Sequence, residues 1–456
     1  MNIRDKITQN GTPQIRDLVV KSRKITDLAP YSRNARTHTK AQIRQIAESI
    51  RKFGWTNPVL VDRDNGIIAG HARVEAAKLL GIDAVPVIHL DALSEAQKRA
   101  YILADNKLAL NADWDEEILV EELSGILDME TNFDVTITGF ATPEIDQLVI
   151  SYGQNDDGID PKGTIPDRPD SPVTQAGDVW VLGDGHRLLC GDARDLESYQ
   201  ILLGNTVAQL VVFDPPYNVP IKGNVSGKGR KIHGNFSMAC GEMSGEEYRA
   251  FLMAIMRNSA TFSTDGSLHY HFIDWRHILD MMQVGEQSCY EILNLCIWDK
   301  GLGGMGAFYR SQHELVCVFK NGTASYINNI QLGQFGRNRT NVWHYPGQAG
   351  FHAERAADLS RHPTVKPVQM IEDIILDASH RGDIVLDPCI GSGTTIMAAE
   401  HSGRTCYAME FDPAYVDVCV TRFQDTTGLS AIHEASGQSF GDLTTARTFK
   451  EGRTDG

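Results

Sequence analysis

The strongest constraint on the fold is an alternation of apolar strands with helical segments in the C-terminal half of the chain. Short runs rich in Val, Ile, Leu and Phe indicate buried strands, and segments with helical periodicity separate them. The predicted strands are residues 207–213, 268–273, 292–298, 315–319, 384–386 and 405–409, and the helices include 368–379 and 394–401. This alternation predicts an α/β fold with a mainly parallel sheet and helices on both faces. Ligands bind such sheets outside the carboxyl ends of the strands.

The chain of 456 residues is expected to contain two domains. Residues 151–177 are rich in Pro, Gly and Asp and lack apolar periodicity, which predicts a linker. This places a smaller α+β domain at residues 1–150 and the α/β domain at residues 178–425. The small and polar residues 426–456 predict a flexible tail.

The N-terminal domain has its own helix and strand signals. Apolar residues recur at helical spacing between Thr39, a predicted N-cap, and Gly54, a predicted helix end. Predicted strands then follow at residues 58–61, 67–69 and 85–90, and an acidic helix is expected at 113–128.

Gly70, His71 and Arg73 lie where one of these strands turns into a helix that Gly81 ends. A helix N-terminus that carries His and Arg can hold a phosphate, so we predict a phosphate or nucleotide turn here. An ordinary capped helix with a surface arginine is the alternative. No clustered acid–His set stands out in this domain, and we expect no metal site.

Composition leaves the partner open. The net charge of −16 argues against nucleic acid, but residues 1–60 hold twelve basic and four acidic residues. Local patches decide phosphate binding, so DNA stays open as a partner. The eight cysteines form no C-x-x-C pair, which fits a reducing cytosol. With no secretory signal and no long apolar run, we expect a cytoplasmic protein without a membrane partner.

Asp214, Pro215, Pro216 and Tyr217 follow directly after the predicted strand 207–213. Two prolines fix the backbone and hold a carbonyl away from any strand ladder, beside the Asp214 carboxylate. Tyr217 adds a flat face on which a ring can stack. Two acceptors and an aromatic plate suit a planar substrate with an exocyclic amine, which they would orient for attack on an electrophile. A Pro-rich strand terminator is the structural alternative.

A second motif runs from the strand 384–386 through a glycine turn into a helix. Gly391 and Gly393 allow close approach of the backbone to a ligand, and Glu410 follows nineteen residues after Gly391, where a ribose diol is bound in nucleoside-cofactor folds. Position 396 is Ile, which argues against NAD or FAD, and Asp387 would repel a pyrophosphate. A cationic, phosphate-free cofactor such as S-adenosylmethionine fits better. The predicted cofactor residues of this region are Asp387, Pro388, Gly391, Ser392, Gly393, Thr394 and Glu410.

Together the two motifs resemble those of the DNA amino-methyltransferases, over residues 178–423. The Asp-Pro-Pro-Tyr motif precedes the glycine motif, an order similar to the beta group of that family. Further similar segments are residues 186–192, whose Asp192 is expected near the cofactor adenine, and residues 362–367, a motif before the cofactor helix. The resemblance adds Asp192, His362, Thr364 and Lys366 to the predicted cofactor residues. Cys389 replaces the family's usual Phe, which puts cofactor affinity in doubt.

The resemblance implies methyl transfer to the N6 amine of adenine in duplex DNA, because Asp before Pro-Pro-Tyr is more typical of adenine N6 than of cytosine N4 enzymes. Cytosine N4 methylation stays open, as do RNA or protein amine methylation and a ParB-like DNA-binding protein with a non-catalytic methyltransferase domain. A duplex substrate implies base flipping. The sequence reveals neither the recognition site nor a cognate restriction enzyme, and it leaves a homodimer open.

Two basic regions are predicted to contact DNA. Residues 215–241 contain basic side chains, five glycines and no acid, which predicts a mobile phosphate-contacting loop, with a solvated surface loop as the alternative. Residues 300–350 combine Arg, Lys and Asn with the single acid Glu314, a mixture that suits groove contact and target recognition. The predicted DNA-binding residues are Lys222, Lys228, Arg230, Lys231, Arg337 and Arg339.

Residues 25–90 resemble the ParB/sulfiredoxin-like fold. Sulfiredoxins carry a Cys that residues 1–189 lack, which excludes peroxide repair. We favour a DNA-engaging accessory role for this domain. Such fusions to methyltransferases occur in phage and mobile-element proteins, which suggests that origin by analogy.

Overall fold

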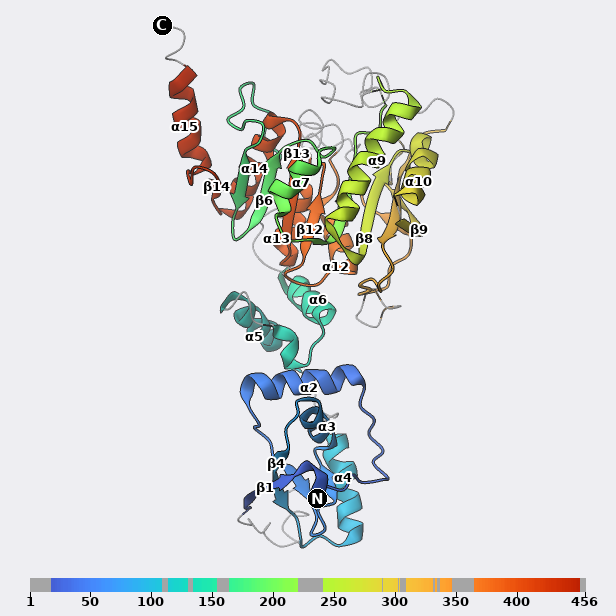
Figure 1. Cartoon of the computed structure of the whole chain (residues 1–456), viewed down its shortest axis with the longest axis vertical. Helices are drawn as coiled ribbons and strands as arrows, with labels where there is room; N and C mark the ends of the chain where they lie inside the picture. Colours follow the sequence, from blue (N-terminus) through green and yellow to red (C-terminus); the bar gives the residue numbers. More distant parts are fainter. Residues whose placement is uncertain are drawn as a thin grey trace, which may run out of the picture. The chain divides into compact units, whose positions relative to one another are not determined.

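The computed structural model describes residues 18–451 of the chain with ten gaps. The gaps are residues 109–113, 130–133, 154–163, 220–240, 289, 302, 304–308, 331–332, 334–336 and 347–364. The chain forms two compact units, Met1–Tyr152 and Gly153–Gly456, which are coloured blue to teal and green to red in Figure 1.

The first unit is built on a small mixed sheet of four strands in the order β1-β4-β2-β3. The strands are β1 (Val20–Lys24), β2 (Val59–Val61), β3 (Ile67–Ala69) and β4 (Ala84–His89). Strand β4 is antiparallel to β1 and parallel to β2. Buried valines of β2 and β4 form the core of this sheet together with helix α3 (His71–Leu79). The α+β class predicted for the N-terminal domain is confirmed.

The α-helices described in the first unit are α2 (Lys40–Phe53), α3 (His71–Leu79), α4 (Glu95–Leu108), α5 (Glu116–Met129) and α6 (Thr142–Gly153). Helix α2 begins as predicted, because the Thr39 hydroxyl accepts a hydrogen bond from the backbone of Gln42. It ends at Gly54, which adopts a left-handed φ of 78°. Helices α5 and α6 share a separate small core around Leu123 and Ile145.

The second unit contains a sheet of ten strands in the order β11-β9-β10-β8-β7-β12-β13-β6-β5-β14. Its centre is parallel, from β8 (Ser263–Ile273) through β7 (Ala208–Phe213), β12 (Ile384–Asp387) and β13 (Thr405–Glu410) to β6 (His186–Cys190). The antiparallel pairs of this sheet all involve its outer strands. These are β9 (Tyr290–Asp299), β10 (His313–Asn321), β11 (Val342–His344), β5 (Val179–Leu182) and β14 (Ala431–His433). The predicted mainly parallel α/β fold and all six predicted strands are confirmed.

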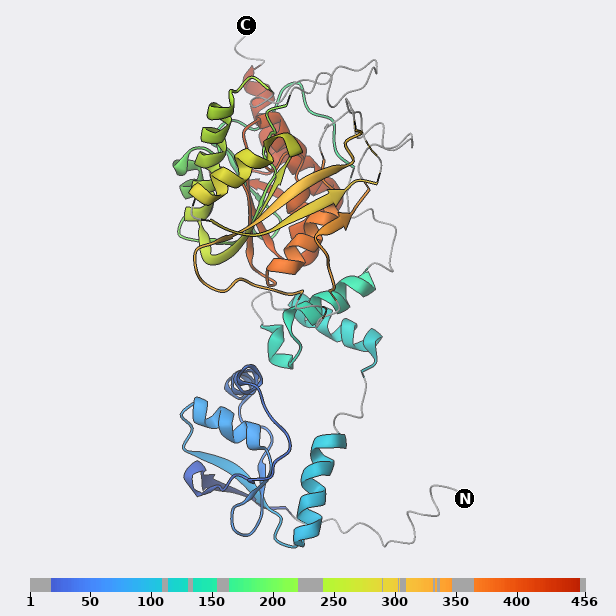
Figure 2. The same cartoon turned by 90° about the vertical axis from the view of Figure 1, so that its right-hand side faces the viewer.

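Helices cover both faces of this sheet. Successive residues of β7 alternate between two cores, since Leu210 and Val212 belong to one and Val211 and Phe213 to the other. The first core includes α12 (Val368–Ala378), α13 (Thr394–Ser402) and α14 (Pro413–Thr427), and the second includes α7 (Leu196–Leu203), α9 (Gly245–Thr261) and α10 (Ile278–Gln287). In Figure 2, the yellow-green α9 and α10 lie on the opposite side of the sheet from the orange α12.

The predicted flexible tail is wrong for residues 431–451. Strand β14 pairs with β5, and helix α15 (Phe440–Glu451) follows it. The side chain of Leu443 is buried, and Arg447 forms an ion pair with Asp178 at 2.7 Å. Ala431 and Leu443 belong to the core on one face of the sheet, and Phe440 packs against it.

The predicted linker is also partly wrong. Residues 164–177 pack on α14, where the Asp417 carboxylate accepts hydrogen bonds from the backbone of Val173 and Thr174 at 2.6 and 3.1 Å. Ile165 is buried against Val418. The composition indicates correctly that this segment lacks regular secondary structure, but it gives no information on packing. Within the described part of the chain, no helix is long and apolar enough to cross a membrane.

Candidate active site

Four neighbouring parallel strands end at the same edge of the sheet, and a carboxylate follows or closes each of them. In the order β7-β12-β13-β6, these carboxylates are Asp214, Asp387, Glu410 and Asp192. Leu386 of β12 pairs with Val211 of β7, so the Asp-Pro-Pro-Tyr corner and the glycine turn start side by side. One pocket is lined by both motifs.

The Asp-Pro-Pro-Tyr corner is held from two sides. The Pro216 carbonyl accepts a hydrogen bond from the Tyr248 hydroxyl of α9 at 3.1 Å. The Tyr217 hydroxyl donates to Oδ1 of Asp214 at 2.8 Å. Both contacts fix a corner that the two prolines already stiffen, which leaves the Asp214 carboxylate at the wall of the pocket.

Lys366 lies against Asp214 although 152 residues separate them in sequence. Its Nζ atom is 2.7 Å from Oδ2 of Asp214 and 3.2 Å from Oε2 of Glu314. Oε1 of Glu314 in turn pairs with Lys300 at 2.5 Å. Two carboxylates and two ammonium groups therefore form one cluster, in which only 6% of the Lys366 side chain is exposed.

Three aromatic rings surround the Lys366 ammonium. Its Nζ atom lies 5.4 Å from the ring centre of Tyr217, 5.1 Å from that of Phe272 and 5.8 Å from that of Trp298. Aromatic faces stabilise a cation at such distances. Burial disfavours the charged lysine, but the two carboxylates outweigh it and raise the pKa of Lys366.

The two carboxylates of the cluster differ in their pKa. Burial raises the pKa of Asp214, and the Glu314 charge adds to this shift while Lys366 opposes it. Burial alone would also raise the pKa of Glu314, but Lys366 and Lys300 outweigh it and lower that pKa to about 2. Glu314 therefore has the lower pKa of the two carboxylates, and Asp214 is the more basic one.

The glycine turn after β12 is shaped by Asp387. Its Oδ1 accepts a hydrogen bond from the Cys389 backbone at 3.0 Å and its Oδ2 from the Thr395 hydroxyl at 2.6 Å. Gly391 and Gly393 have left-handed φ angles of 58° and 87°, which glycine adopts without strain. Burial raises the pKa of Asp387 to about 7.

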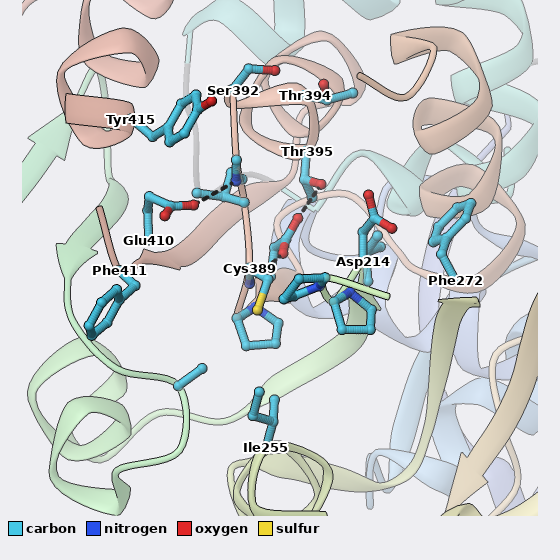
Figure 3. Close-up of a pocket in the computed structure, with 18 of the residues that line it drawn as sticks. Asp214, Ile255, Phe272, Cys389, Ser392, Thr394, Thr395, Glu410, Phe411 and Tyr415 are labelled. Atoms are coloured by element: carbon cyan, nitrogen blue, oxygen red, sulfur yellow. Dashed lines mark hydrogen bonds between the residues drawn. The ribbon is translucent and has the colours of Figure 1, made fainter. Parts of the chain in front are cut away.

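Glu410 at the end of β13 faces the same turn. Its Oε2 accepts a hydrogen bond from the backbone N–H of Gly391 at 3.1 Å, and its Oε1 accepts one from the backbone N–H of Asp412 at 2.9 Å. Burial raises the pKa of Glu410 to about 7. Figure 3 shows this carboxylate beside the turn, with Tyr415 and Phe411 on either side of it.

Twelve of the fifteen predicted catalytic and cofactor residues line this pocket, and Gly393 is not among them. The twelve are Asp192, Asp214, Pro215, Pro216, Tyr217, Lys366, Asp387, Pro388, Gly391, Ser392, Thr394 and Glu410. Asp192 is held by Arg194, and the thiol of Cys389 also reaches the pocket (Figure 3). Among the described residues, no group of three His, Cys, Asp or Glu side chains could hold a metal ion.

The predicted cofactor residue Lys366 lines the pocket, where its ammonium pairs with Asp214 and Glu314, and a cofactor contact stays a prediction. The predicted DNA contacts in residues 300–350 need correction. Arg337 and Arg339 were expected to contact DNA, but their side chains are only 10% and 16% exposed and both pair with Asp373 and Asp377 of α12. A guanidinium engaged by two carboxylates is not available to a base edge, so we withdraw both from the predicted DNA contacts.

Several other predicted residues lie outside the described part of the chain. They are His362 and Thr364 of the predicted cofactor set and Lys222, Lys228, Arg230 and Lys231 of the predicted DNA-contacting loop.

Sequence reasoning missed Glu314 and Lys300 as members of the site. Both lie at the outer pair β9 and β10, beyond the motifs. A signal was present, because Glu314 is the one acid in a basic stretch that holds five Lys and Arg residues. Its partner Lys366, however, could not be deduced from spacing.

In the predicted phosphate turn of the first unit, the side chains of His71 and Arg73 form hydrogen bonds within the unit. Gly70 is the N-cap of α3 with a φ of 102°. His71 Nε2 accepts a hydrogen bond from the Tyr31 backbone at 3.3 Å, and Arg73 donates to the Asn57 carbonyl at 2.6 Å. Burial lowers the pKa of His71. The turn exists as predicted, and phosphate binding stays a prediction.

Family models match three consecutive segments of the chain. The ParB N-terminal domain matches residues 10–107, and the ParB-methyltransferase HTH domain matches residues 117–176. The DNA methylase family with N6 or N4 specificity matches residues 208–421, which contain both motifs of the pocket. The part of the chain that holds the pocket thus matches the DNA methylase family of the N6/N4 type.

Individual relatives agree with this division. The ParB-like nuclease domain-containing protein YnaK of Escherichia coli (strain K12) is 54% identical over 77 residues, 17% of this chain and 88% of the relative. The type II methyltransferase M.HpaI of Haemophilus parainfluenzae is 23% identical over 273 residues, 56% of this chain and 80% of the relative. The solved M1.HpyAVI–SAM complex covers 52% of this chain and 97% of its own, at 18% identity and a TM-score of 0.39. The chain belongs to the ParB-like family, in the form of a ParB-like module fused to a DNA methylase.

Proposed function

We propose that this protein transfers a methyl group from S-adenosylmethionine to the N6 amine of adenine in duplex DNA. The observation that carries this proposal is the adjacency of β7 and β12, which brings Asp214 and the glycine turn into one pocket. For direct transfer of a methyl group, the residues that bind the substrate amine and the turn that binds the cofactor have to lie in the same pocket.

Asp214 and the Pro215 carbonyl orient the amine. The nitrogen lone pair of adenine is delocalised into the ring, and two acceptors that bind both N–H groups favour a nitrogen whose lone pair points out of the ring plane. The raised pKa of Asp214 also suits it to accept the proton that the nitrogen loses after transfer. Orientation and electrostatics at Asp214 therefore supply most of the proposed catalysis.

The pocket residues fit S-adenosylmethionine, which supplies a methyl group on a sulfonium. Carboxylates line the pocket, and among its described lining residues the only Lys or Arg is Lys366, which is already paired. Such a pocket disfavours phosphate and favours a cationic ligand. The Glu410 carboxylate would accept hydrogen bonds from ribose hydroxyls, and the left-handed Gly391 and Gly393 let the backbone approach the ligand.

Adenine inside a duplex cannot reach this pocket, so the base must leave the stack at a cost of a few kcal/mol. Tyr217 offers replacement stacking at the pocket wall, and its hydroxyl contacts keep the ring in place. We further propose that the ParB-like unit engages DNA as an accessory, because the basic residues of the first sixty positions lie in it.

Digestion of methylated DNA tests the proposal. The full-length protein is incubated with methyl-labelled S-adenosylmethionine and plasmid DNA, and the nucleosides are then separated. Labelled N6-methyldeoxyadenosine supports the proposal, whereas labelled N4-methyldeoxycytidine would replace it with cytosine methylation. Label in RNA or protein but not in DNA would contradict it.

Asp214→Asn tests the proposed mechanism. We expect methylation to be lost while cofactor binding, measured by calorimetry, persists. Asp184→Asn in the exposed turn between β5 and β6 is the matched control and should retain activity. If Asp214→Asn remains fully active, the assigned mechanism is wrong.

A further inference from the structure

The contacts of Asp214 pose a problem for amine binding. Before any substrate enters, Oδ1 of Asp214 accepts the Tyr217 hydroxyl and Oδ2 pairs with Lys366. Both donors approach the same carboxylate that has to accept the amine. If they remain there, the incoming N–H groups compete with two established contacts, one of them charged.

Glu314 offers both donors a second acceptor. The Tyr217 hydroxyl carries one hydrogen but has two carboxylate oxygens in reach, Asp214 at 2.8 Å and Glu314 at 3.0 Å. Lys366 lies similarly between Asp214 at 2.7 Å and Glu314 at 3.2 Å. Each donor can therefore shift toward Glu314 without losing a hydrogen-bond partner, and a shift frees Asp214.

Lys300 keeps Glu314 in place and charged. It approaches Oε1 of Glu314, the oxygen that Tyr217 and Lys366 leave unused. Its Nζ atom also lies 4.8 Å from the ring centre of Trp298. Glu314 thus binds one lysine on its outer side and two donors on its inner side.

From this geometry, and resting on the proposed function, we propose that Glu314 is a positioning residue that draws Tyr217 and Lys366 away from Asp214 when the amine binds. It does not touch the substrate itself. Its position at the start of β10, opposite Trp298 of β9, makes the outer antiparallel strands part of the catalytic arrangement.

Glu314→Gln in the full-length protein tests this role. An amide keeps the size but binds the lysine poorly, so we expect kcat to fall by about 10- to 100-fold, as for a lost charged hydrogen bond. The cofactor dissociation constant should not change. The matched control is Glu291→Gln, which breaks the Glu291–Lys320 pair at 2.6 Å at the other end of the same two strands.

The pH profile separates this role from a merely structural one. The Glu314 charge raises the pKa of Asp214, so its removal should shift the acidic limb of kcat to lower pH. The titratable and charged groups that face Asp214 are Tyr217 on its own loop, Lys366, Glu314, Asp387, Cys389 and Tyr248. Glu314→Gln changes only one of these groups, so a shift of the acidic limb to lower pH can be assigned to the loss of the Glu314 charge.

Three outcomes decide the inference. A lower kcat with a shifted acidic limb supports it, and a wild-type kcat and pH profile in Glu314→Gln overturns it while methylation by the wild type stands. If the wild type methylates no DNA, the proposed function fails and the inference falls with it. If Glu314→Gln does not fold, the double variant Glu314→Gln/Lys300→Gln is measured instead. It removes one negative and one positive charge, and its kcat and pH profile are judged by the same criteria.

Discussion

The Nζ atom of Lys366 lies 2.7 Å from Oδ2 of Asp214, and this ion pair joins the segment before α12 to the corner after β7. The Lys366 side chain is 6% exposed and that of Asp214 is 23% exposed. An ion pair in this setting ties two distant parts of the chain together, and the loss of one partner leaves the other charge buried.

Lys366→Met should therefore destabilise the second unit. We expect the free energy of unfolding to fall by about 3–5 kcal/mol, as when one partner of a buried pair is removed. Because Lys366 lowers the pKa of Asp214, the acidic limb of activity should also move to higher pH. Denaturant unfolding and a pH series of initial rates measure the two effects.

Lys320→Met is the control for this change, because its partner Glu291 is 58% exposed. For Lys320→Met we expect the free energy of unfolding to fall by no more than about 1 kcal/mol. Equal losses in the two variants would contradict a special role for the Lys366 pair.

The two contiguous motifs were predictable from sequence, and the resemblance also placed Lys366 at the site, but neither Glu314 nor the contacts of Lys366 with Asp214 and Glu314 were predicted. Asp214 and Gly391 each follow an apolar strand, and the rule that ligands bind at strand ends places them together. Lys366 and Glu314 reach the site from other segments, 152 and about 100 residues away. No local pattern encodes such contacts, because they depend on the order of strands in the sheet.

Charge and composition gave wrong predictions where tertiary packing decides the position of a side chain. Arg337 and Arg339 have the composition of a DNA-contacting segment, yet each finds Asp373 and Asp377 on α12. The tail residues look polar, yet Leu443 is buried and Arg447 pairs with Asp178, just before β5. In both cases a few tertiary contacts outweigh the average character of the segment.

Cofactor binding should strengthen as the pH rises from about 6 to about 8. Burial raises the pKa of Glu410 to about 7, so this carboxyl is largely neutral at pH 6 and ionised at pH 8. Only the ionised form offers both oxygens to ribose hydroxyls and attracts a cationic ligand. Calorimetric titration of S-adenosylmethionine at several pH values measures the effect.

Glu410→Gln should reduce this pH dependence and weaken cofactor binding by about 1–3 kcal/mol. A remaining dependence is expected from Asp387, whose pKa is also raised to about 7 by burial. A dissociation constant equal to that of the wild type at pH 8 would rule out the proposed ribose contact.

Gly393→Ala should disturb the cofactor turn. Gly393 has a φ of +87°, and an added Cβ would lie 3.2 Å from the Sγ atom of Cys419. A left-handed φ costs roughly 1–2 kcal/mol in any residue with a Cβ, and crowding adds to it here. We expect lower stability and about tenfold weaker cofactor binding.

Gly382→Ala separates strain from crowding, because Gly382 has a similar φ of +81° and no atom within 4 Å of its added Cβ. It should lose stability from the backbone strain alone and keep its cofactor affinity. If both variants bind cofactor equally well, the turn at Gly393 is not the cofactor turn.

The salt dependence of DNA binding should distinguish structural arginines from DNA contacts. Arg337→Gln/Arg339→Gln removes two cations from the pairs with Asp373 and Asp377, so we expect a lower melting temperature but an unchanged slope of log affinity against log salt. Replacement of Lys222, Lys228, Arg230 and Lys231 by Gln should instead lower that slope by about 0.9 for each lost phosphate contact. Fluorescence anisotropy over a salt series gives both slopes.

A reduced slope in the arginine variant would return these residues to the DNA interface, and an unchanged slope in the loop variant would remove the loop from it.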